Sequence, residues 1–360
     1  KVGLAEELYS LGLQSRINPA DHPEIAEKIT SARQTLRDAA AQNRELADLV
    51  EFWDDGAFNQ NASLLENVLY AMPVNARASI ADYAEDDAVI AVLTESGADK
   101  PLVRAGLAIA EQLVELLGAV DEDSSLLDSF SDYSKKDILA SADVVEKFRM
   151  KSDHKPTDEE RRLLLSFALA FIPVRDRLDA VDDEVEAQLL TARAKAIELT
   201  QNNDAFVSFR EDRYSPALSL SENLLHGKRR YDRRSAWKKF DEFLEDEIER
   251  SGLRKGITAV GLGAQLGAGG AGLSASSKKR SALIRALLKR PEMIVIEGVA
   301  AGVTPEDRAV RAEIIAEMAG KTVIMALTSE DAARKCDHII MVNDDGTAKD
   351  GAPDSMLEPA

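Results

Sequence analysis

The chain has 360 residues, a formal net charge of −19 and a pI of about 4.8. This length allows about two or three domains with cores of their own. The acidity argues against nonspecific nucleic-acid binding, because phosphates repel such a surface. Aromatic residues make up only 5% of the chain while alanine, leucine and acidic residues abound, which is typical of a mostly helical protein.

The few cysteine and histidine residues exclude some classes of site. The single cysteine, Cys336, rules out a disulfide framework and favours a reducing cytoplasm. The four histidines are scattered without metal-ligand spacing, so no metal site is expected. The best apolar run, residues 163–174, is shorter than the roughly 18 residues of a membrane span. We therefore expect no transmembrane segment and no signal peptide. The chain begins at Lys1 instead of Met, which leaves a trimmed or partial chain open.

The first 200 residues are expected to be helical. Residues 23–50 and 179–199 carry apolar side chains at helical spacing, with charges between them. Thr157 and Glu160 have the spacing of a capping box and predict a helix that begins there.

Three blocks of sequence recur in the same order. Residues 58–69 align with residues 214–225 at an offset of 156, and residues 96–107 with residues 251–262 at an offset of 155. A third block pairs residues 24–33 with residues 184–193. In the first block Ser63, Leu64, Glu66, Asn67 and Leu69 match Ser219, Leu220, Glu222, Asn223 and Leu225. The chain is thus predicted to hold two degenerate copies of a unit of roughly 150 to 160 residues. Unrelated helical hairpins of similar composition are the alternative.

The last 90 residues alternate between helix and strand patterns. A helix should follow Ser274 as N-cap, and a second should follow Thr304 as N-cap and Pro305 as its first residue. Short apolar strands are expected at residues 293–298, which end at a glycine, and at residues 321–328, and a third strand runs into a turn over residues 338–346. This order predicts a parallel sheet with helical cover. The fold class expected is mostly α with an α/β C-terminal part, with domains at residues 1–150, 151–265 and 266–360.

Two nucleotide-binding patterns compete for the glycine-rich segment. Gly267, Gly269 and Gly272 have the G-x-G-x-x-G spacing of a dinucleotide-binding turn. Such a turn must directly follow a strand, and "GLGAQL" before it is a poor strand. An acidic residue should also end the next strand, whereas Glu292 precedes one. We therefore favour the other pattern.

From residue 214 to residue 357 the chain resembles the second half of an ABC-transporter nucleotide-binding domain. Ser219, Glu222, Asn223, Leu224, Leu225 and Gly227 match the family's segment after its glutamine loop. "VGLGAQLGAGGAGLS", "RALLKRP" and "CDHIIMVNDDGTAKDGAPDSML" follow in the family's order. The helical first copy resembles the long insertion of some large bacterial ABC transporter ATPases.

The resemblance implies a domain that has lost its phosphate-binding parts. The P-loop is absent, because Gly320-Lys321-Thr322 lacks the upstream glycine, where Ile315 stands, and precedes a strand. In the signature-like segment Leu273 and Ser274 match, but Ala275, Ser276 and Ser277 replace Gly-Gly-Gln, and side chains there should crowd a phosphate. A helix N-terminus with basic residues remains, so ATP with Mg²⁺ should bind weakly if at all and no cofactor is expected.

The catalytic carboxylate and the switch histidine are replaced as well. Glu297 aligns with the Mg²⁺-supporting aspartate, Gly298 with the catalytic glutamate and Thr328 with the switch histidine. An alignment moved by one residue would instead place Glu297 at the catalytic position and Ile296 at the metal position, and a strand-end carboxylate in a turn is the plainer alternative for Glu297. Gly298 cannot orient water, and losing such a group typically costs about 10²- to 10⁴-fold in rate. We expect a pseudo-ATPase with no catalytic residues.

A basic segment, residues 227–239, interrupts the acidic chain. It lies where the family places its membrane-facing helical subdomain, so it predicts contact with a membrane protein or anionic headgroups. A solvated helix face is the plainer alternative. The candidate contact residues are Lys228, Arg229, Arg230, Arg233, Arg234 and Trp237.

Three hypotheses follow for function. The first is a degenerate, structural or regulatory subunit of a transporter-like membrane complex, cytoplasmic and peripheral to the membrane. Its partner would be a membrane protein or another ABC-type domain. The second is part of a working ATPase whose P-loop lies upstream or on a partner. The third is a helical interaction scaffold in which the C-terminal part is only a folding unit.

Overall fold

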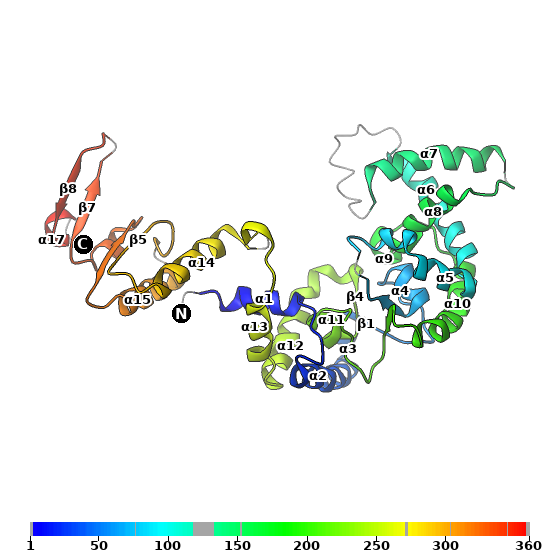
Figure 1. Ribbon diagram of the computed structural model, residues 1–360, viewed down its shortest axis with the longest axis horizontal. Helices are drawn as coiled ribbons and strands as arrows, with labels where there is room; N and C mark the ends of the chain where they lie inside the picture. Colours follow the sequence, from blue (N-terminus) through cyan, green and yellow to red (C-terminus); the bar gives the residue numbers. More distant parts are fainter. Residues whose placement is uncertain are drawn as a thin grey trace. The chain divides into compact units, whose positions relative to one another are not determined.

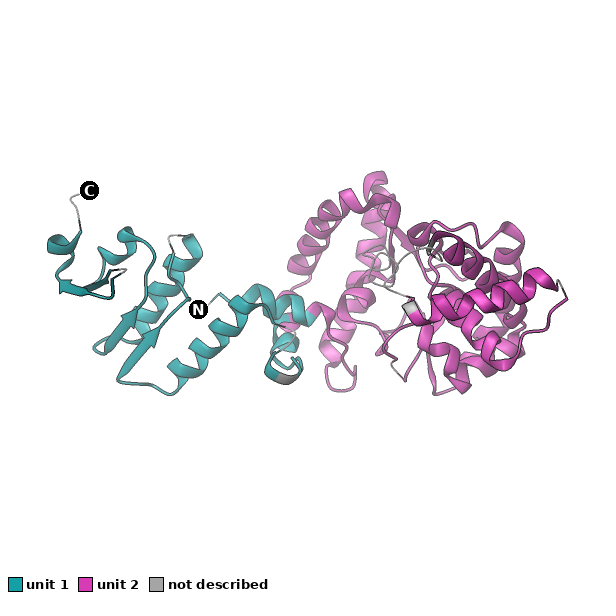
Figure 2. Ribbon diagram, turned by 90° about the horizontal axis from the view of Figure 1, so that it is seen from above, with its two compact units in different colours: residues 1–12, 258–360 teal, residues 13–257 magenta. Residues whose placement is uncertain are grey.

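The computed structural model describes residues 3–75, 77–117, 133–151, 153–270, 273–302, 304–343 and 345–357. Helices dominate and the sheets have two strands each, which confirms the mostly α fold class. The chain forms two compact units, one of Leu13–Ile257 and one of Lys1–Gly12 with Thr258–Ala360 (Figure 2). The expected boundaries at residues 150 and 265 stay predictions.

The larger unit is built from helices and two small sheets (Figure 1). Its helices are α2 (Pro23–Gln42), α3 (Arg44–Ala47), α4 (Leu64–Leu69), α5 (Asp87–Ser96), α6 (Asp99–Leu117), α7 (Lys135–Met150), α8 (Asp158–Ala170), α9 (Pro173–Asp176), α10 (Asp183–Gln201), α11 (Leu220–Leu225) and α12 (Trp237–Arg250), with 3-10 helices η1 (Ala81–Glu85) and η3 (Tyr231–Ala236). Its main core joins α4, α5, α6, α8 and α10 through fully buried leucines such as Leu64, Leu102, Leu164 and Leu189.

The four strands of this unit pair across the two expected copies. β1 (Val50–Phe52) is antiparallel to β4 (Gly227–Arg229), and β2 (Ala71–Pro73) is antiparallel to β3 (Phe206–Ser208). The expectation of an all-helical first 200 residues is therefore wrong at β1 and β2. Three-residue strands are too short to show a periodicity, and their partners lie far away in the sequence.

Two glycines at equivalent positions allow helices to approach closely. A Cβ added at Gly106 of α6 would lie 2.0 Å from the carbonyl oxygen of Leu164 in α8. A Cβ added at Gly261 of α13 (Arg254–Leu262) would lie 1.8 Å from the carbonyl oxygen of Leu8 in α1 (Ala5–Gln14). In each pair, helices from different expected copies are in contact.

Replacing Gly106 with alanine is expected to lower the free energy of unfolding by about 1–3 kcal/mol, because α6 and α8 must move apart. Gly256→Ala is the control, since its Cβ would meet only the side chain of Ile25, at 3.3 Å. That variant should be near neutral in urea titrations followed by circular dichroism. Equal losses for both variants would contradict the role of the close approach.

The smaller unit carries the C-terminal elements. They are α14 (Ala275–Leu288), β5 (Met293–Ile296), α15 (Pro305–Glu317), β6 (Thr322–Met325), α16 (Glu330–Ala333), β7 (Ile339–Val342), β8 (Ala348–Gly351) and α17 (Pro353–Met356), with the 3-10 turn η4 (Ala268–Gly270) before them. The N-caps predicted at Ser274 and Thr304 are confirmed, as is the capping box of Thr157 and Glu160 in the larger unit.

The parallel sheet is smaller than its sequence pattern predicts. β5 and β6 pair in parallel, as expected, but β7 does not join them. It forms an antiparallel hairpin with β8, because the chain reverses tightly between Asn343 and Gly346. Gly346 has a φ of 81°, which a glycine adopts without steric cost.

The β5–β6 sheet has one covered face. Ile294 and Ile296 are buried against α14 and α15, which lie beside β5 in Figure 1. On the other face Met293, Val295 and Ile324 are 58%, 68% and 45% exposed. Strands that are apolar on both faces are typical of sheets buried on both sides. Within the described part of the chain, this face has no cover.

Candidate functional site

Two buried arginines organise the larger unit. Arg33 of α2 donates five hydrogen bonds, to the carbonyl and side-chain oxygens of Asn223 and to the carbonyls of residues 210, 211 and 213. Arg193 of α10 donates five as well, to the two oxygens of Asn67 and to the carbonyls of residues 54, 55 and 57. The accepting positions in the two sets are 156 apart.

Each arginine binds the loop and helix of the other expected copy. Arg33 lies in the first copy and its acceptors in the second, and the reverse holds for Arg193. The exchange matches the strand pairing of β1 with β4 and β2 with β3. The third repeated block aligns Arg33 with Arg193, but the sequence alone assigns a role to neither. The matching "AR" ends of that block were the available signal.

The helices that carry Asn67 and Asn223 are fixed in the same way. Ser63 and Glu66 form a capping box at the start of α4, as Ser219 and Glu222 do at α11. Both helices end at a residue with left-handed backbone, Tyr70 or His226. The residues that the sequence matched to the ABC family thus build this local frame.

Lys228, expected to contact a partner, forms a buried ion pair. Its Nζ lies 2.6 Å from Oε1 of Glu66, whose side chain is only 5% exposed. Burial raises the pKa of Glu66, but the Lys228 ammonium and the Ser63 donors outweigh it and bring that pKa below its ordinary value. The position equivalent to Lys228 in the first copy is Met72, so Glu222 has no matching lysine.

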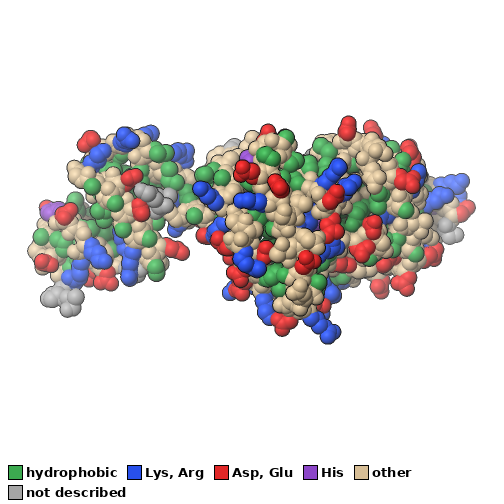
Figure 3. Space-filling view, turned by 90° about the horizontal axis from the view of Figure 1, so that it is seen from below, with side chains coloured by type: hydrophobic (Ala, Val, Ile, Leu, Met, Phe, Trp, Pro, Cys, Tyr) green, Lys and Arg blue, Asp and Glu red, His purple; other side chains and the backbone are tan. Residues whose placement is uncertain are grey.

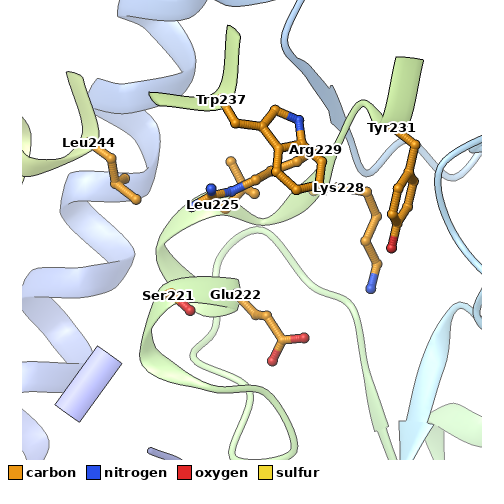
Figure 4. Close-up of a pocket in the computed structure, with 9 residues that line it drawn as sticks. Ser221, Glu222, Leu225, Lys228, Arg229, Tyr231, Trp237 and Leu244 are labelled. Carbon is orange, nitrogen blue, oxygen red and sulfur yellow. The ribbon is translucent and has the colours of Figure 1, made fainter. Parts of the chain in front are cut away.

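A cavity of about 210 Å³ opens beside this pair. Figure 4 shows Trp237 and Arg229 above the end of α11, with Glu222 and Lys228 on either side of the open space. Its walls are Ser221, Glu222, Leu225, Gly227, Lys228, Arg229, Tyr231, Trp237 and Leu244. Sequence reasoning missed this cavity, because its polar residues were assigned either to the ABC-like motif or to the basic segment.

The other basic residues are largely neutralised by the chain itself. Arg229 pairs with Asp241 at 2.7 Å, and both Arg230 and Arg233 pair with Asp48. Arg234 lies over the rings of Tyr231 and Trp237, and the Trp237 indole N–H donates to the Arg230 carbonyl. Acidic and basic side chains are interspersed in the same way over the face drawn in Figure 3. Partner contact through these residues stays a prediction.

Buried His226 differs from its counterpart Tyr70. Both ring nitrogens of His226 lack a hydrogen-bond partner among the described residues, and its side chain is buried. Burial, with the charges of Arg33 and Arg37, lowers its pKa from 6.5 to about 3. The unfolded chain therefore takes up a proton near pH 6.5 that the folded chain refuses until about pH 3.

Stability should consequently fall as the pH drops below 6.5. Between pH 7 and pH 5 the loss expected from His226 is about 2 kcal/mol in the free energy of unfolding. His226→Tyr, which places the counterpart's residue at the same backbone conformation, should remove most of this dependence. Urea titrations of both proteins at the two pH values make the comparison. An equally steep pH dependence in the variant would rule His226 out as its cause.

The signature-like segment of the smaller unit opens a capped helix. The Ser274 hydroxyl accepts from the backbone N–H of Ser277, whose own hydroxyl donates to the Glu7 carboxylate at 2.9 Å. Leu273 precedes the cap, and Ala275 and Ser276 are exposed in the first turn. An acidic side chain of the same unit thus lies at the helix end where the sequence predicted weak anion binding.

The other three predicted positions lie at the ends of β5 and β6. Glu297 is exposed, and Gly298 has a φ of 68° with the Lys279 ammonium against its backbone. Thr328 donates its hydroxyl to the carbonyl of Ala301 at 3.1 Å. Thr328 thereby holds the turn after β5. Among the described residues, Glu297 has no hydrogen bond or ion pair that would orient it.

No group of three or more potential metal-ligating side chains gathers within the described ranges. There, too, no helix has the length and apolar character needed to cross a membrane. Of the three glycines of the dinucleotide-like pattern, Gly267 and Gly269 have positive φ, and Gly272 lies outside the described residues.

Part of the chain is similar to a curated protein. The chain is 27% identical over 125 residues to the ATP-dependent lipid A-core flippase of Vibrio vulnificus (strain CMCP6). The aligned part covers 33% of this chain and 21% of the flippase, so the chain spans about a fifth of that relative's length. No family model and no solved structure matches the chain. The match supports a relationship to ABC transporters at this coarse level.

Proposed function

We propose that the chain is a catalytically degenerate ABC-ATPase-like protein that acts as a structural or regulatory subunit of a transporter-like complex at the membrane. The observation that carries the proposal is the replacement of the residues needed for hydrolysis at the ends of β5 and β6. At the places aligned with the catalytic glutamate and the switch histidine stand Gly298 and Thr328, and the Thr328 hydroxyl donates to the Ala301 carbonyl in the turn after β5. A transporter-related role agrees with the similarity to the flippase.

The retained framework supports the same proposal. The capped helix α14, the parallel β5–β6 pair and α15 all form, although the residues for hydrolysis are replaced. Glu7 at the start of α14 adds a negative charge where a nucleotide phosphate would otherwise approach. Selection on such a domain would act on its shape and surfaces.

The purified chain is expected to hydrolyse Mg-ATP no faster than a buffer blank. Its rate should equal that of Glu297→Gln, since no described residue orients Glu297 toward a phosphate. A coupled phosphate-release assay on both proteins, prepared in parallel, makes the test. Turnover well above the blank that disappears in Glu297→Gln would contradict the proposal.

A working composite ATPase is the second candidate, and one observation favours it. The uncovered face of the β5–β6 sheet, with Met293, Val295 and Ile324, would suit a further layer of an ABC-type domain from a partner. Slowed hydrogen exchange of β5 and β6 in the presence of a P-loop-bearing partner would support it. Unchanged exchange would favour the degenerate subunit.

Contact with the membrane partner is proposed at η3 and the start of α12. Most of the predicted contact residues are paired internally, so the surplus positive charge is small. Arg234 and Lys238 have no carboxylate within ion-pair distance among the described residues. We therefore propose that Arg234 and Trp237 carry this contact, while Lys228, Arg229, Arg230 and Arg233 stay in ion pairs with carboxylates of the chain.

A further inference from the structure

The two capping-box glutamates differ in how their outer oxygen is satisfied. Oε2 of Glu66 accepts from the N–H and hydroxyl of Ser63, and its Oε1 is bound by Lys228. Oε2 of Glu222 accepts in the same way from Ser219, at 2.8 Å from both donors. Oε1 of Glu222 has no hydrogen-bond or ion-pair partner within the described ranges.

The difference follows from one substitution between the expected copies. Lys228 reaches from β4 to the glutamate of the other copy, and the position equivalent to it in β2 is Met72. A methionine has no donor for a carboxylate. Glu66 therefore shows what a glutamate at this position binds, a primary ammonium at 2.6 Å. At Glu222 the chain supplies no such ammonium.

Glu222 lies in the wall of the cavity without an ion pair of its own among the described residues, and its charge acts there on the Lys228 ammonium, which is bound to Glu66. The two cations of the wall, Lys228 and Arg229, are paired with Glu66 and Asp241. The cluster thus keeps one negative charge, that of Glu222, facing a space of about 210 Å³ (Figure 4). Leu225, Leu244 and Trp237 give the same space an apolar lining.

The second copy has also become more polar around this space. Ser221 stands where Leu65 is fully buried in the first copy, and Lys228 and Arg229 stand where the first copy has Met72 and Pro73. The shared frame is kept while the surface over it changes from packing residues to hydrogen-bonding ones.

We propose that this cavity binds a primary ammonium group on an aliphatic stem, with Oε1 of Glu222 accepting its hydrogen bond. The stem would pack against Leu225, Leu244 and Trp237, as lysine stems do on apolar surface. The source is either a free alkylamine or a lysine side chain of a partner protein. The inference is independent of the ABC-like function, since it rests on the larger unit alone.

The first test is titration of the full chain with n-butylammonium, followed by calorimetry and by indole NMR shifts. Saturable binding is expected, and Glu222→Gln should weaken it about tenfold or more, because a charge-assisted hydrogen bond becomes a neutral one. Glutamine still completes a capping box, so this variant should fold. Glu245→Gln is the control, since it removes the same charge from an exposed part of α12 outside the cavity.

A second variant tests the equivalence of the two copies. Met72 packs against the cluster of Trp53, Phe209 and Leu218 and does not line the cavity. A lysine at this position is expected to reach Glu222 as Lys228 reaches Glu66, so n-butylammonium should bind Met72→Lys about tenfold more weakly. Binding unchanged in both Glu222→Gln and Met72→Lys, or binding of n-butyrate in preference to n-butylammonium, would overturn the proposal. So would the absence of saturable binding.

A second ligand distinguishes the two possible sources of the ammonium, a free alkylamine and a partner's lysine. The site is assigned to a partner's lysine if N-acetyl-lysine N-methylamide binds more tightly than n-butylammonium and if Nε-acetylation of this ligand abolishes its binding. Tighter binding of the free amine would assign it to a small alkylamine. Both results support the ammonium site and differ only in its ligand.

Discussion

Replacing Arg193 with methionine is expected to lower the free energy of unfolding by at least about 3 kcal/mol. The side chain is 1% exposed and its five hydrogen bonds join α10 to the loop and helix around Asn67. Methionine keeps the bulk but leaves these buried oxygens without donors. Arg33→Met should cost a similar amount, because its acceptors are equivalent. Urea unfolding followed by circular dichroism gives the values.

Two controls separate the hydrogen bonds from charge and volume. Lys195→Met, on the exposed side of the same helix, should change stability by less than about 0.5 kcal/mol. Arg193→Lys should recover little of the stability that Arg193→Met loses, since an ammonium cannot donate in the forked geometry of a guanidinium. Full recovery by lysine would mean that charge alone matters at this position.

Replacing Lys228 with methionine, the residue at the equivalent place in the first copy, is expected to cost about 3 kcal/mol. The change leaves the buried Glu66 carboxylate without its cation, which is strongly destabilising in protein interiors. The effect should lie at the low end of the range for such pairs, because the Lys228 side chain is 25% exposed.

Combining Lys228→Met with Glu66→Gln should restore most of the lost stability. The neutral amide can keep the capping box and no longer needs a counter-charge. A double-mutant cycle by urea titration measures the coupling. Strictly additive losses would show that the two side chains do not depend on each other.

The sequence predicts the local elements well, but it does not predict the contacts that cross between the two repeated copies. The caps at Thr157, Ser274 and Thr304 follow from short-range chemistry, and all three are present. The repeated blocks predict that Arg33 is equivalent to Arg193. They do not say which copy each arginine binds, because equivalence within a sequence carries no information on partners in space. The crossed pairing of β1 with β4 and β2 with β3 depends on such long-range contacts.

The candidate site shows the same division. The basic segment was recognised from composition, but composition does not show that Lys228 bonds Glu66 or that Arg229 bonds Asp241. The cavity beside Glu222 depends on the packing of η3 and α12 over α11, which no motif encodes. The antiparallel pairing of β7 was also missed, since an apolar strand fits either direction.

The most direct test of the proposed function is co-purification of the native protein with its partners, followed by intact mass measurement and peptide mapping of each component. If the chain is a degenerate subunit, we expect it to co-purify with membrane proteins. We also expect any ATP hydrolysis by that complex to proceed without this chain. A P-loop-bearing partner that hydrolyses ATP only when this chain is bound would contradict the proposal. So would a longer native polypeptide that contains both this chain and a P-loop and hydrolyses ATP. Either result would make the chain one part of a composite ATPase.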